Sequence, residues 1–309
     1  MSPGRRFRQR GFAIIMAMLV VALAASIAAF MAWQQSLWVR QAENLGNLAQ
    51  ADAIARAAGR WMQMMLTEDA KNQDTKFQTL LLSGELPAVP VEYGAASVAM
   101  IDLQGRFNLN NLVPGGKLSQ PDVDAFRRLL QSLDLQPDLA NAVVDWIDPD
   151  GETTFPGGAE DADYLALNPP YRAANQPLFD VDELVRVKGF DADAVNRLRP
   201  FVTALPAPSQ VNLNSASPEV LSALLPKLSL FDAQELVAAR HDRPFKDLGD
   251  AASRYPELEF SPSRFGVDSQ FFLGAATAHF DRATVSYQML LARSSKGGVQ
   301  IVWQKPVSF

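Results

Sequence analysis

Residues 12–33 read FAIIMAMLVVALAASIAAFMAW, and this stretch decides how the rest of the chain is arranged. Its one polar side chain is that of Ser26. A helix rises about 1.5 Å per residue, so the stretch matches the hydrocarbon core of a bilayer in length. Arginines at positions 5, 6, 8 and 10 precede it. Basic residues collect on the cytoplasmic side of a membrane, so we expect a single span with the chain after Trp33 on the other side.

The junction between the basic segment and the apolar stretch is Arg10-Gly11-Phe12. A secretory signal peptide has a shorter apolar region and a small-residue cleavage site after it, and neither is present here. The short basic leader (residues 1–11), the glycine, the phenylalanine and the long apolar helix resemble the N-terminus of type IV prepilins and pseudopilins. The resemblance implies that a prepilin peptidase cuts after Gly11 and methylates Phe12. A plain signal anchor is the alternative interpretation.

Met16 stands where pilins usually carry a glutamate, four residues after the processed phenylalanine. A carboxylate inside a bilayer is costly and needs a partner. In pilins that partner is taken to be the N-terminal amine of the subunit already in the filament. A subunit with nothing ahead of it has no such partner. Met16 therefore either argues against a pilin or marks the first subunit, at the filament tip.

The helical pattern continues beyond the membrane span. Apolar residues recur at spacings of three and four as far as Leu66, and no proline occurs between Pro3 and Pro87. We therefore expect one helix from Phe12 to about Leu66, whose second half lays an apolar stripe on a folded domain. Residues 67–97 have the composition of loops and turns.

Both ends of the chain contribute to an expected sheet. The predicted strands are residues 97–103, 271–280, 283–293 and 299–304, and the last three form an antiparallel meander. A long helix against a small antiparallel sheet gives an α+β fold. Its pilin-like core comprises residues 34–117 and the C-terminal meander 267–309.

The middle of the chain has a different composition. Residues 118–266 contain 24 acidic and 13 basic residues, a net charge of −11, against −6 for the whole chain. The predicted helices are residues 120–133, 137–146, 181–186, 192–198, 218–225 and 232–240. We expect this region to be an α-helical domain inserted into the α+β core.

The phrases GRFNLNNL (105–112), VVDWIDPDG (143–151), PYRAANQPLFDVDELVRVKGF (170–190) and VNLNSAS (211–217) make the resemblance specific. With the prepilin-type leader and the inserted domain, they resemble the GspK family of minor pseudopilins of the bacterial type II secretion system. The resemblance covers nearly the whole chain. It implies a subunit in the inner membrane, with its globular part in the periplasm, that caps the pseudopilus tip for protein secretion. The implied partners are GspI, GspJ and GspH, with secreted substrates as further candidates.

Residues 145–183 contain ten carboxylates and one base, Arg172. Like charges this dense repel one another, yet the segment also carries apolar residues suited to burial. Calcium resolves the conflict, because it takes six to eight oxygen ligands and accepts irregular loops. Asp148-Pro-Asp150-Gly151 starts like an EF-hand, but Ala159 stands at the twelfth position. The GspK resemblance also implies a structural calcium ion. The candidate ligands are Asp148, Asp150, Glu160 and Asp163, followed by Asn175 and Asp161; a solvated acidic loop is the alternative.

Catalysis is not expected. The chain has no cysteine, which excludes disulfides, thiol catalysis and thiolate metal sites, and its two histidines, His241 and His279, form no metal-binding motif. Acid pairs such as Asp145 and Asp148 are common in an acidic loop, and no nucleophile–base set accompanies them.

Nucleic-acid binding is the main rival function. Residues 211–240 resemble the helix-hairpin-helix modules of DNA-uptake proteins, with 184–198 as a weaker second copy. Such modules hold phosphates with backbone amides of a glycine-rich hairpin and with basic residues. The hairpin here, residues 225–230, has no glycine, and the domain around it is acidic. We therefore expect no nucleic-acid partner, and a membrane-anchored DNA-uptake protein remains the alternative.

Overall fold

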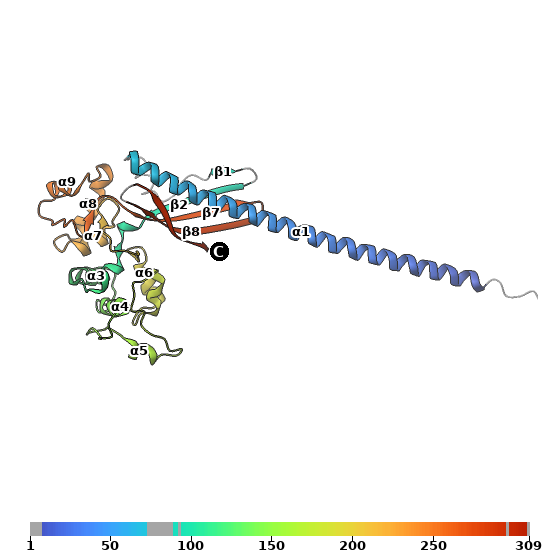
Figure 1. Ribbon diagram of the computed structural model, residues 1–309, viewed down its shortest axis with the longest axis horizontal. Coiled ribbons are helices and arrows are strands. Elements are labelled where there is room, and N and C mark those ends of the chain that lie inside the picture. The colour runs from blue at the N-terminus through green and yellow to red at the C-terminus, as the bar shows by residue number, and fades with distance from the viewer. Residues whose placement is uncertain (1–7, 73–88, 92–93, 295–296, 308–309) are drawn as a thin grey trace, which may run out of the picture.

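The computed structural model describes residues 8–72, 89–91, 94–294 and 297–307. One helix, α1 (Arg8–Asn72), has 65 residues and is therefore about 100 Å long. Its N-terminal half projects from the body of the molecule, while its C-terminal half lies along a sheet (Figure 1). The expected single helix is confirmed, and it extends beyond the predicted bounds at both ends.

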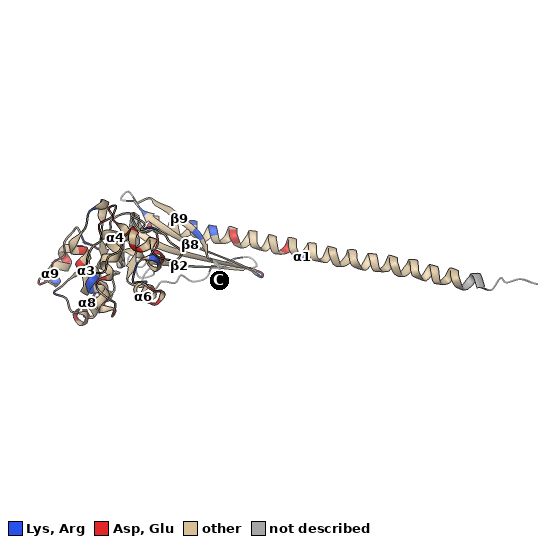
Figure 2. Ribbon diagram, turned by 90° about the horizontal axis from the view of Figure 1, so that it is seen from below, with Lys and Arg blue, Asp and Glu red and all other residues tan. Residues whose placement is uncertain are grey.

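The projecting half of α1 has the properties of a membrane span. No charged side chain occurs between Gly11 and Arg40, and Figure 2 shows this part of the helix free of charge. Its most apolar window has a mean hydropathy of 2.7 and is not buried by the rest of the structure. The helix is thus long and apolar enough to cross a bilayer once.

Within the described residues, the sheet has five antiparallel strands in the order β1-β2-β7-β8-β9. They are β1 (Val89–Val91), β2 (Gly94–Asp102), β7 (Phe271–Phe280), β8 (Ala283–Arg293) and β9 (Val299–Val307). β7 and β8 have the predicted bounds. The loop expected over residues 67–97 is wrong where the chain is described, because α1 reaches Asn72 and both β1 and the start of β2 lie there. Residues 73–88 and 92–93 lie outside the described residues.

The second half of α1 packs on one face of this sheet, as the apolar stripe predicts. Ala58, Met62 and Leu66 of the helix share a buried cluster with residues of β2, β7, β8 and β9. A Cβ atom at Gly59 would lie 2.9 Å from the Met289 side chain. The glycine that weakens the helix therefore lets it approach the sheet closely.

The inserted region leaves the sheet at the end of β2 and returns at the start of β7. Its helices are α3 (Gln120–Ser132), α4 (Leu139–Ile147), α5 (Asp161–Leu165), α6 (Ala192–Leu198), α7 (Pro218–Leu224), α8 (Leu230–Asp242) and α9 (Leu248–Arg254). Short 3-10 helices are η1 (Leu103–Gly105), η2 (Leu109–Asn111), η3 (Pro114–Gly116) and η4 (Val181–Arg186). The helix predicted over 181–186 is thus a 3-10 helix, and α5 and α9 were not predicted. The α+β class, with a long N-terminal helix, a small antiparallel sheet and a helical insertion, is confirmed.

Two halves of the inserted region share one plan, and we name them module 1 (residues 107–205) and module 2 (residues 211–267). Each begins with a strand, β3 (Phe107–Asn108) or β5 (Val211–Asn212), and continues through a helical pair, α3–α4 or α7–α8. Each ends in a strand that pairs in parallel with the first, β4 (Val202–Thr203) or β6 (Phe265–Gly266). Between the helical pair and the last strand, module 1 has a long segment that contains α5, η4 and α6. The corresponding segment of module 2 is short and contains α9.

One carboxylate ties the inserted region to the sheet. Asp102, the last residue of β2, accepts hydrogen bonds at Oδ2 from Ser215 Oγ (2.6 Å), Ser269 Oγ (2.6 Å) and Asn212 Nδ2 (3.1 Å). Its Oδ1 accepts from the backbone N–H of Gln104 (2.8 Å). The sheet and module 2 are therefore held together at the point where the chain leaves the core.

Candidate metal site in the inserted domain

The acidic loop of module 1 begins where α4 ends. Asp145, on the last turn of α4, is fully buried and accepts from the backbone N–H of Thr154, 3.0 Å from Oδ2. Burial raises the pKa of Asp145 above its usual value. A Cβ at Gly158 would lie 2.2 Å from Asp145 Oδ2, so a glycine is required there. Asp145 thus folds the loop back onto α4, a role that the sequence did not reveal.

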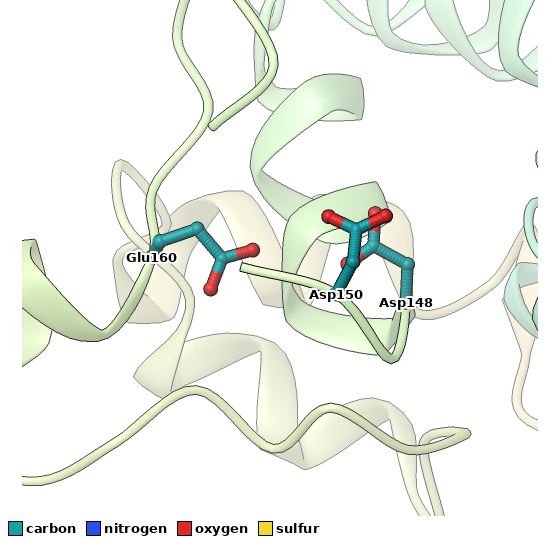
Figure 3. Close-up of side chains that lie close together, drawn as sticks. All are labelled: Asp148, Asp150 and Glu160. Carbon is teal, nitrogen blue, oxygen red and sulfur yellow. The ribbon is translucent and has the colours of Figure 1, made fainter. Parts of the chain in front are cut away.

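Three carboxylates converge beside this fold-back. Asp148, Asp150 and Glu160 each offer an oxygen within 4.8 Å of the others. Figure 3 shows Asp148 and Asp150 side by side after α4, with Glu160 extending toward them from another part of the loop. Oxygens bound to one calcium ion at about 2.3–2.6 Å must lie within about 5 Å of one another, so the separation suits a shared ion. We call these three residues the carboxylate triad.

Buried oxygens of the triad have no protein partner. Glu160 is 4% exposed, and neither of its carboxylate oxygens nor Oδ1 of Asp148 accepts a hydrogen bond from the described chain. Burial, together with the neighbouring carboxylates, raises the pKa of Glu160 to about 7 and that of Asp148 to about 6. Buried, unpaired charge is costly, and a divalent cation would remove that cost. The donor set therefore fits a hard cation.

The other three predicted ligands lie in the same loop; Asp163 and Asp161 do not belong to the triad, and Asn175 contacts the backbone of Asp150. Asp163 Oδ1 accepts from Lys188 Nζ (2.8 Å), which lowers the pKa of Asp163, and its Oδ2 accepts from the backbone N–H of Glu160 (3.3 Å). Asp161 pairs with Arg172 at 3.3 Å. Asn175 donates from Nδ2 to the backbone oxygen of Asp150 (3.4 Å). These contacts hold the loop that carries Glu160 and Asp150.

Aromatic packing explains part of the apolar content of the loop. Tyr164 is fully buried, with its ring 5.1 Å from that of Trp146 and 5.4 Å from that of Tyr171. Burial raises the pKa of Tyr164 to about 12. Phe155, in contrast, is 85% exposed. The apolar residues of the loop were all expected to seek burial, and the structure buries only some of them.

The predicted processing site lies at the start of α1. Gly11 is within the helix, and Phe12 and Met16 are both exposed on the projecting half. The side chain of Met16 therefore faces away from the rest of the chain and is free to contact lipid or a neighbouring helix.

The part of module 2 that resembles a helix-hairpin-helix module contains α7 and α8. Arg240, near the end of α8, is buried and donates to the backbone oxygens of Leu213 and Ala216. Lys227, in the hairpin, pairs with Glu259 at 3.3 Å. These two basic side chains therefore have partners within the protein. The weaker copy expected over 184–198 covers the end of η4 and all of α6, while α3–α4 occupy the place of α7–α8 in the plan of module 1.

Comparison with known proteins supports the division into modules. A family model described as type II secretion system protein K matches residues 105–207, and a second with the same description matches residues 211–261. These matches correspond to module 1 and module 2.

Curated relatives match most of the chain. Type II secretion system protein K of Klebsiella pneumoniae is 36% identical, covering 87% of this chain and 90% of the relative. The protein of the same name from Pseudomonas aeruginosa is 34% identical, covering 81% and 78%.

A solved structure shares the fold. The crystal structure of the GspK-GspI-GspJ complex from the enterotoxigenic Escherichia coli type 2 secretion system contains a chain that aligns with a TM-score of 0.69. The two chains are 24% identical, and the alignment covers 91% of this chain and 99% of the other. Sequence relatives, family models and fold agree, and the chain belongs to the type II secretion system protein K (GspK) family of minor pseudopilins.

Proposed function

We propose that this protein occupies the tip of the type II secretion pseudopilus and helps to start its assembly. The observation that carries the proposal is the position of the inserted domain, which lies beyond the sheet at the end opposite the projecting half of α1 (Figure 1). A bulky domain there leaves no room for a subunit to add above it. Met16, which lacks the charge that needs a partner in the preceding subunit, supports the same place in the filament.

The partners that fit this position are GspI and GspJ, the subunits named with GspK in the solved complex, with GspH as a further neighbour. Their helices would pack against the exposed apolar residues that α1 carries beyond the span, among them Leu37, Leu45 and Leu48. Secreted substrates are candidate contacts of the inserted domain. We propose neither a catalytic role nor a nucleic-acid partner.

Processing and topology follow from the start of the chain. We propose that a prepilin peptidase removes residues 1–11 by cutting after Gly11, and that Phe12 is then methylated. The basic leader keeps the N-terminus in the cytoplasm, so the single span holds the protein in the inner membrane with its body in the periplasm.

The carboxylate triad would hold a calcium ion with a structural role. Asp148 and Asp150 follow α4, whereas Glu160 comes from the far side of the loop. When bound, calcium supplies two positive charges and links these two segments. The protein fixes the carboxylates in place through Asp145, Asp163 and Asn175. These supports hold the carboxylates together only in the folded chain, which favours an ion that binds on folding.

The test of the tip position is to locate the protein in assembled pseudopili. A cysteine added at exposed Phe155 in the full chain carries a gold label for electron microscopy, since the natural chain has no cysteine. We expect labels at one end of each filament and about one copy per filament. As a control for activity, the strain that carries this cysteine variant must still secrete its substrates. Labels distributed along the shaft would overturn the proposal.

A further inference from the structure

A cavity of about 370 Å³ lies where the inserted domain meets the sheet. Leu273, Leu290 and Trp303 form its floor, on the sheet face that does not carry α1. The start of η4, the turn after α6 and β4 form its walls. Ligand sites in proteins have volumes of about 300–1,000 Å³ and favour domain boundaries, so both the size and the place suit a bound molecule.

Among the described charged groups that line the cavity, one cation forms no ion pair. Lys305 pairs with Asp180 at 2.8 Å, and Arg199 pairs with Asp182 at 2.5 Å. Arg106 donates to the backbone oxygen of Arg199 (3.1 Å) and forms no ion pair within the described part of the chain. In a domain with an excess of acidic residues, this site has an excess positive charge.

The burial of Arg106 makes this charge costly. Arg106 is partly buried, and burial, together with the charge of Arg199, lowers its pKa. A guanidinium presents a planar set of N–H donors that matches the two oxygens of a carboxylate. A carboxylate ligand would therefore provide the counter-ion that the protein lacks at this point.

Apart from Thr203 and Gln288, the rest of the cavity surface is apolar or aromatic. Phe179 lies 6.2 Å from Trp303 between ring centroids, and the Lys305 ammonium lies 5.2 Å from the Trp303 ring. Phe179 is 65% exposed, so the cavity is accessible from solvent on that side. A ligand with an apolar group next to its carboxylate would contact both halves of the site.

The position of β9 indicates that the ligand is a peptide. β9 is the last strand of the sheet and supplies Trp303 and Lys305, two residues apart and thus on one face. Its outer edge has no neighbouring strand among the described residues. An exposed edge binds extended peptides through backbone hydrogen bonds, while pockets beside it take alternate side chains.

We propose that this cavity binds an extended peptide from a partner protein through a carboxylate next to an apolar side chain, with Arg106 as the anion-binding group. The carboxylate is either a chain terminus or an acidic side chain. This proposal does not depend on the position of the protein in the pseudopilus, because it follows from the cavity and from the free edge of β9.

The first experiment compares 3-phenylpropionate with 3-phenylpropionamide by ligand-observed NMR on the full chain in detergent micelles. The two probes differ in charge but have the same shape. For a probe of this size we expect a dissociation constant of about 1 mM for the acid. Binding of the amide should be at least about tenfold weaker, because its neutral group leaves Arg106 without a counter-ion. Equal binding of the two probes, or binding of neither, would overturn the proposal.

Variants then assign the binding to the cavity. Arg106→Gln should weaken the acid about tenfold and leave the amide unchanged, whereas Arg60→Gln, an exposed arginine on α1, should change neither. Unaltered binding of the acid to Arg106→Gln would overturn the proposal. If Arg106→Gln does not fold, the comparison of acid and amide on the natural chain still decides.

Two short peptides identify the source of the carboxylate. Acetyl-Gly-Phe carries a free terminus beside an aromatic ring, and acetyl-Phe-Glu-Gly-amide carries an internal acid beside one. Tighter binding of the first assigns the site to chain termini, and tighter binding of the second assigns it to acidic side chains. Failure of both peptides to compete with 3-phenylpropionate would overturn the assignment to a peptide.

Discussion

Asn110 and Asn214 make the same set of hydrogen bonds in the two modules of the inserted domain. Asn110 accepts from the N–H of Leu178 (2.8 Å) and donates to the backbone oxygens of Leu178 (2.9 Å) and Leu205 (2.8 Å). Asn214 accepts from the N–H of Phe245 (2.8 Å) and donates to the backbone oxygens of Phe245 (2.9 Å) and Val267 (3.4 Å). Each asparagine therefore closes its module by binding the segment that follows the helical pair.

The first prediction concerns these closures. Asn110→Ala should lower the free energy of unfolding by about 2–4 kcal/mol, because it leaves buried backbone groups without partners. Asn214→Ala should have a smaller effect, since one of its bonds is longer. Asn196→Ala, at an exposed position on α6, should change the free energy by less than about 0.5 kcal/mol. Thermal melts of the three variants measure this; equal stability of Asn110→Ala and Asn196→Ala would contradict the role of the closure.

The second prediction concerns calcium. At a calcium concentration about 100 times the dissociation constant, the natural chain should gain about 2.7 kcal/mol of stability over the protein in chelator. This gain is worth roughly 5–10 °C in melting temperature for a domain of this size. Glu160→Gln should lose most of the gain, because the triad then lacks one charge and one strong ligand.

A matched variant separates the triad from the general acidity of the loop. Glu152 is exposed in the same loop and does not belong to the triad, so Glu152→Gln should keep the calcium response. If Glu160→Gln and Glu152→Gln respond alike, the ion does not bind at the triad.

The third prediction concerns pH in the presence of chelator. The pKa of Glu160 in the folded protein is raised to about 7, and that of Asp148 to about 6, chiefly by burial. The folded state thus binds protons more tightly than the unfolded state, and this contribution to stability is lost as pH rises through those values. The melting temperature of the metal-free protein should therefore rise by several degrees from pH 8 to pH 5.5. Saturating calcium should remove most of this trend, because the bound ion keeps the same oxygens deprotonated in the folded state. A flat profile in chelator would contradict this account of the triad.

The fourth prediction concerns the membrane span. Met16→Glu should not improve pseudopilus assembly or secretion, because a subunit at the tip has no preceding amine to pair with the carboxylate. The measurement is secretion in cells that express the variant at the natural level, with Met18→Leu as the control on the same helix. A clear gain in assembly from Met16→Glu would count against the tip position.

The sequence predicts the helices and strands in which apolar residues recur at a regular spacing over many residues. β7 and β8 have their predicted bounds because alternating side chains and the turns beside them are local signals. The strands β3 to β6 have two residues each, and their partners lie far away in the chain, so no local pattern identifies them. The helix α9 was missed because its start depends on Asp247 as a cap and its packing depends on module 2 as a whole.

The site shows a similar division. Residue type and spacing placed Asp148, Asp150 and Glu160 among six candidate ligands, since a dense group of carboxylates needs a counter-charge. The sequence could not show that Asp163 and Asp161 would pair with Lys188 and Arg172, because those contacts depend on how the loop folds. The role of Asp145 was also hidden, although the glycine pair at 157–158 marks the tight turn that brings the loop against it.

The paired positions Asp102 and Phe272 have a consequence for how the two parts of the chain are joined. Directly opposed residues in an antiparallel ladder have Cα atoms about 5 Å apart, so the whole inserted domain enters and leaves the core through one narrow neck. A short turn could replace residues 103–270 and leave β2 joined to β7 as an ordinary hairpin. The inserted domain and the pilin-like core are therefore separable parts of one chain, because both boundaries of the insertion lie on the same pair of neighbouring strands.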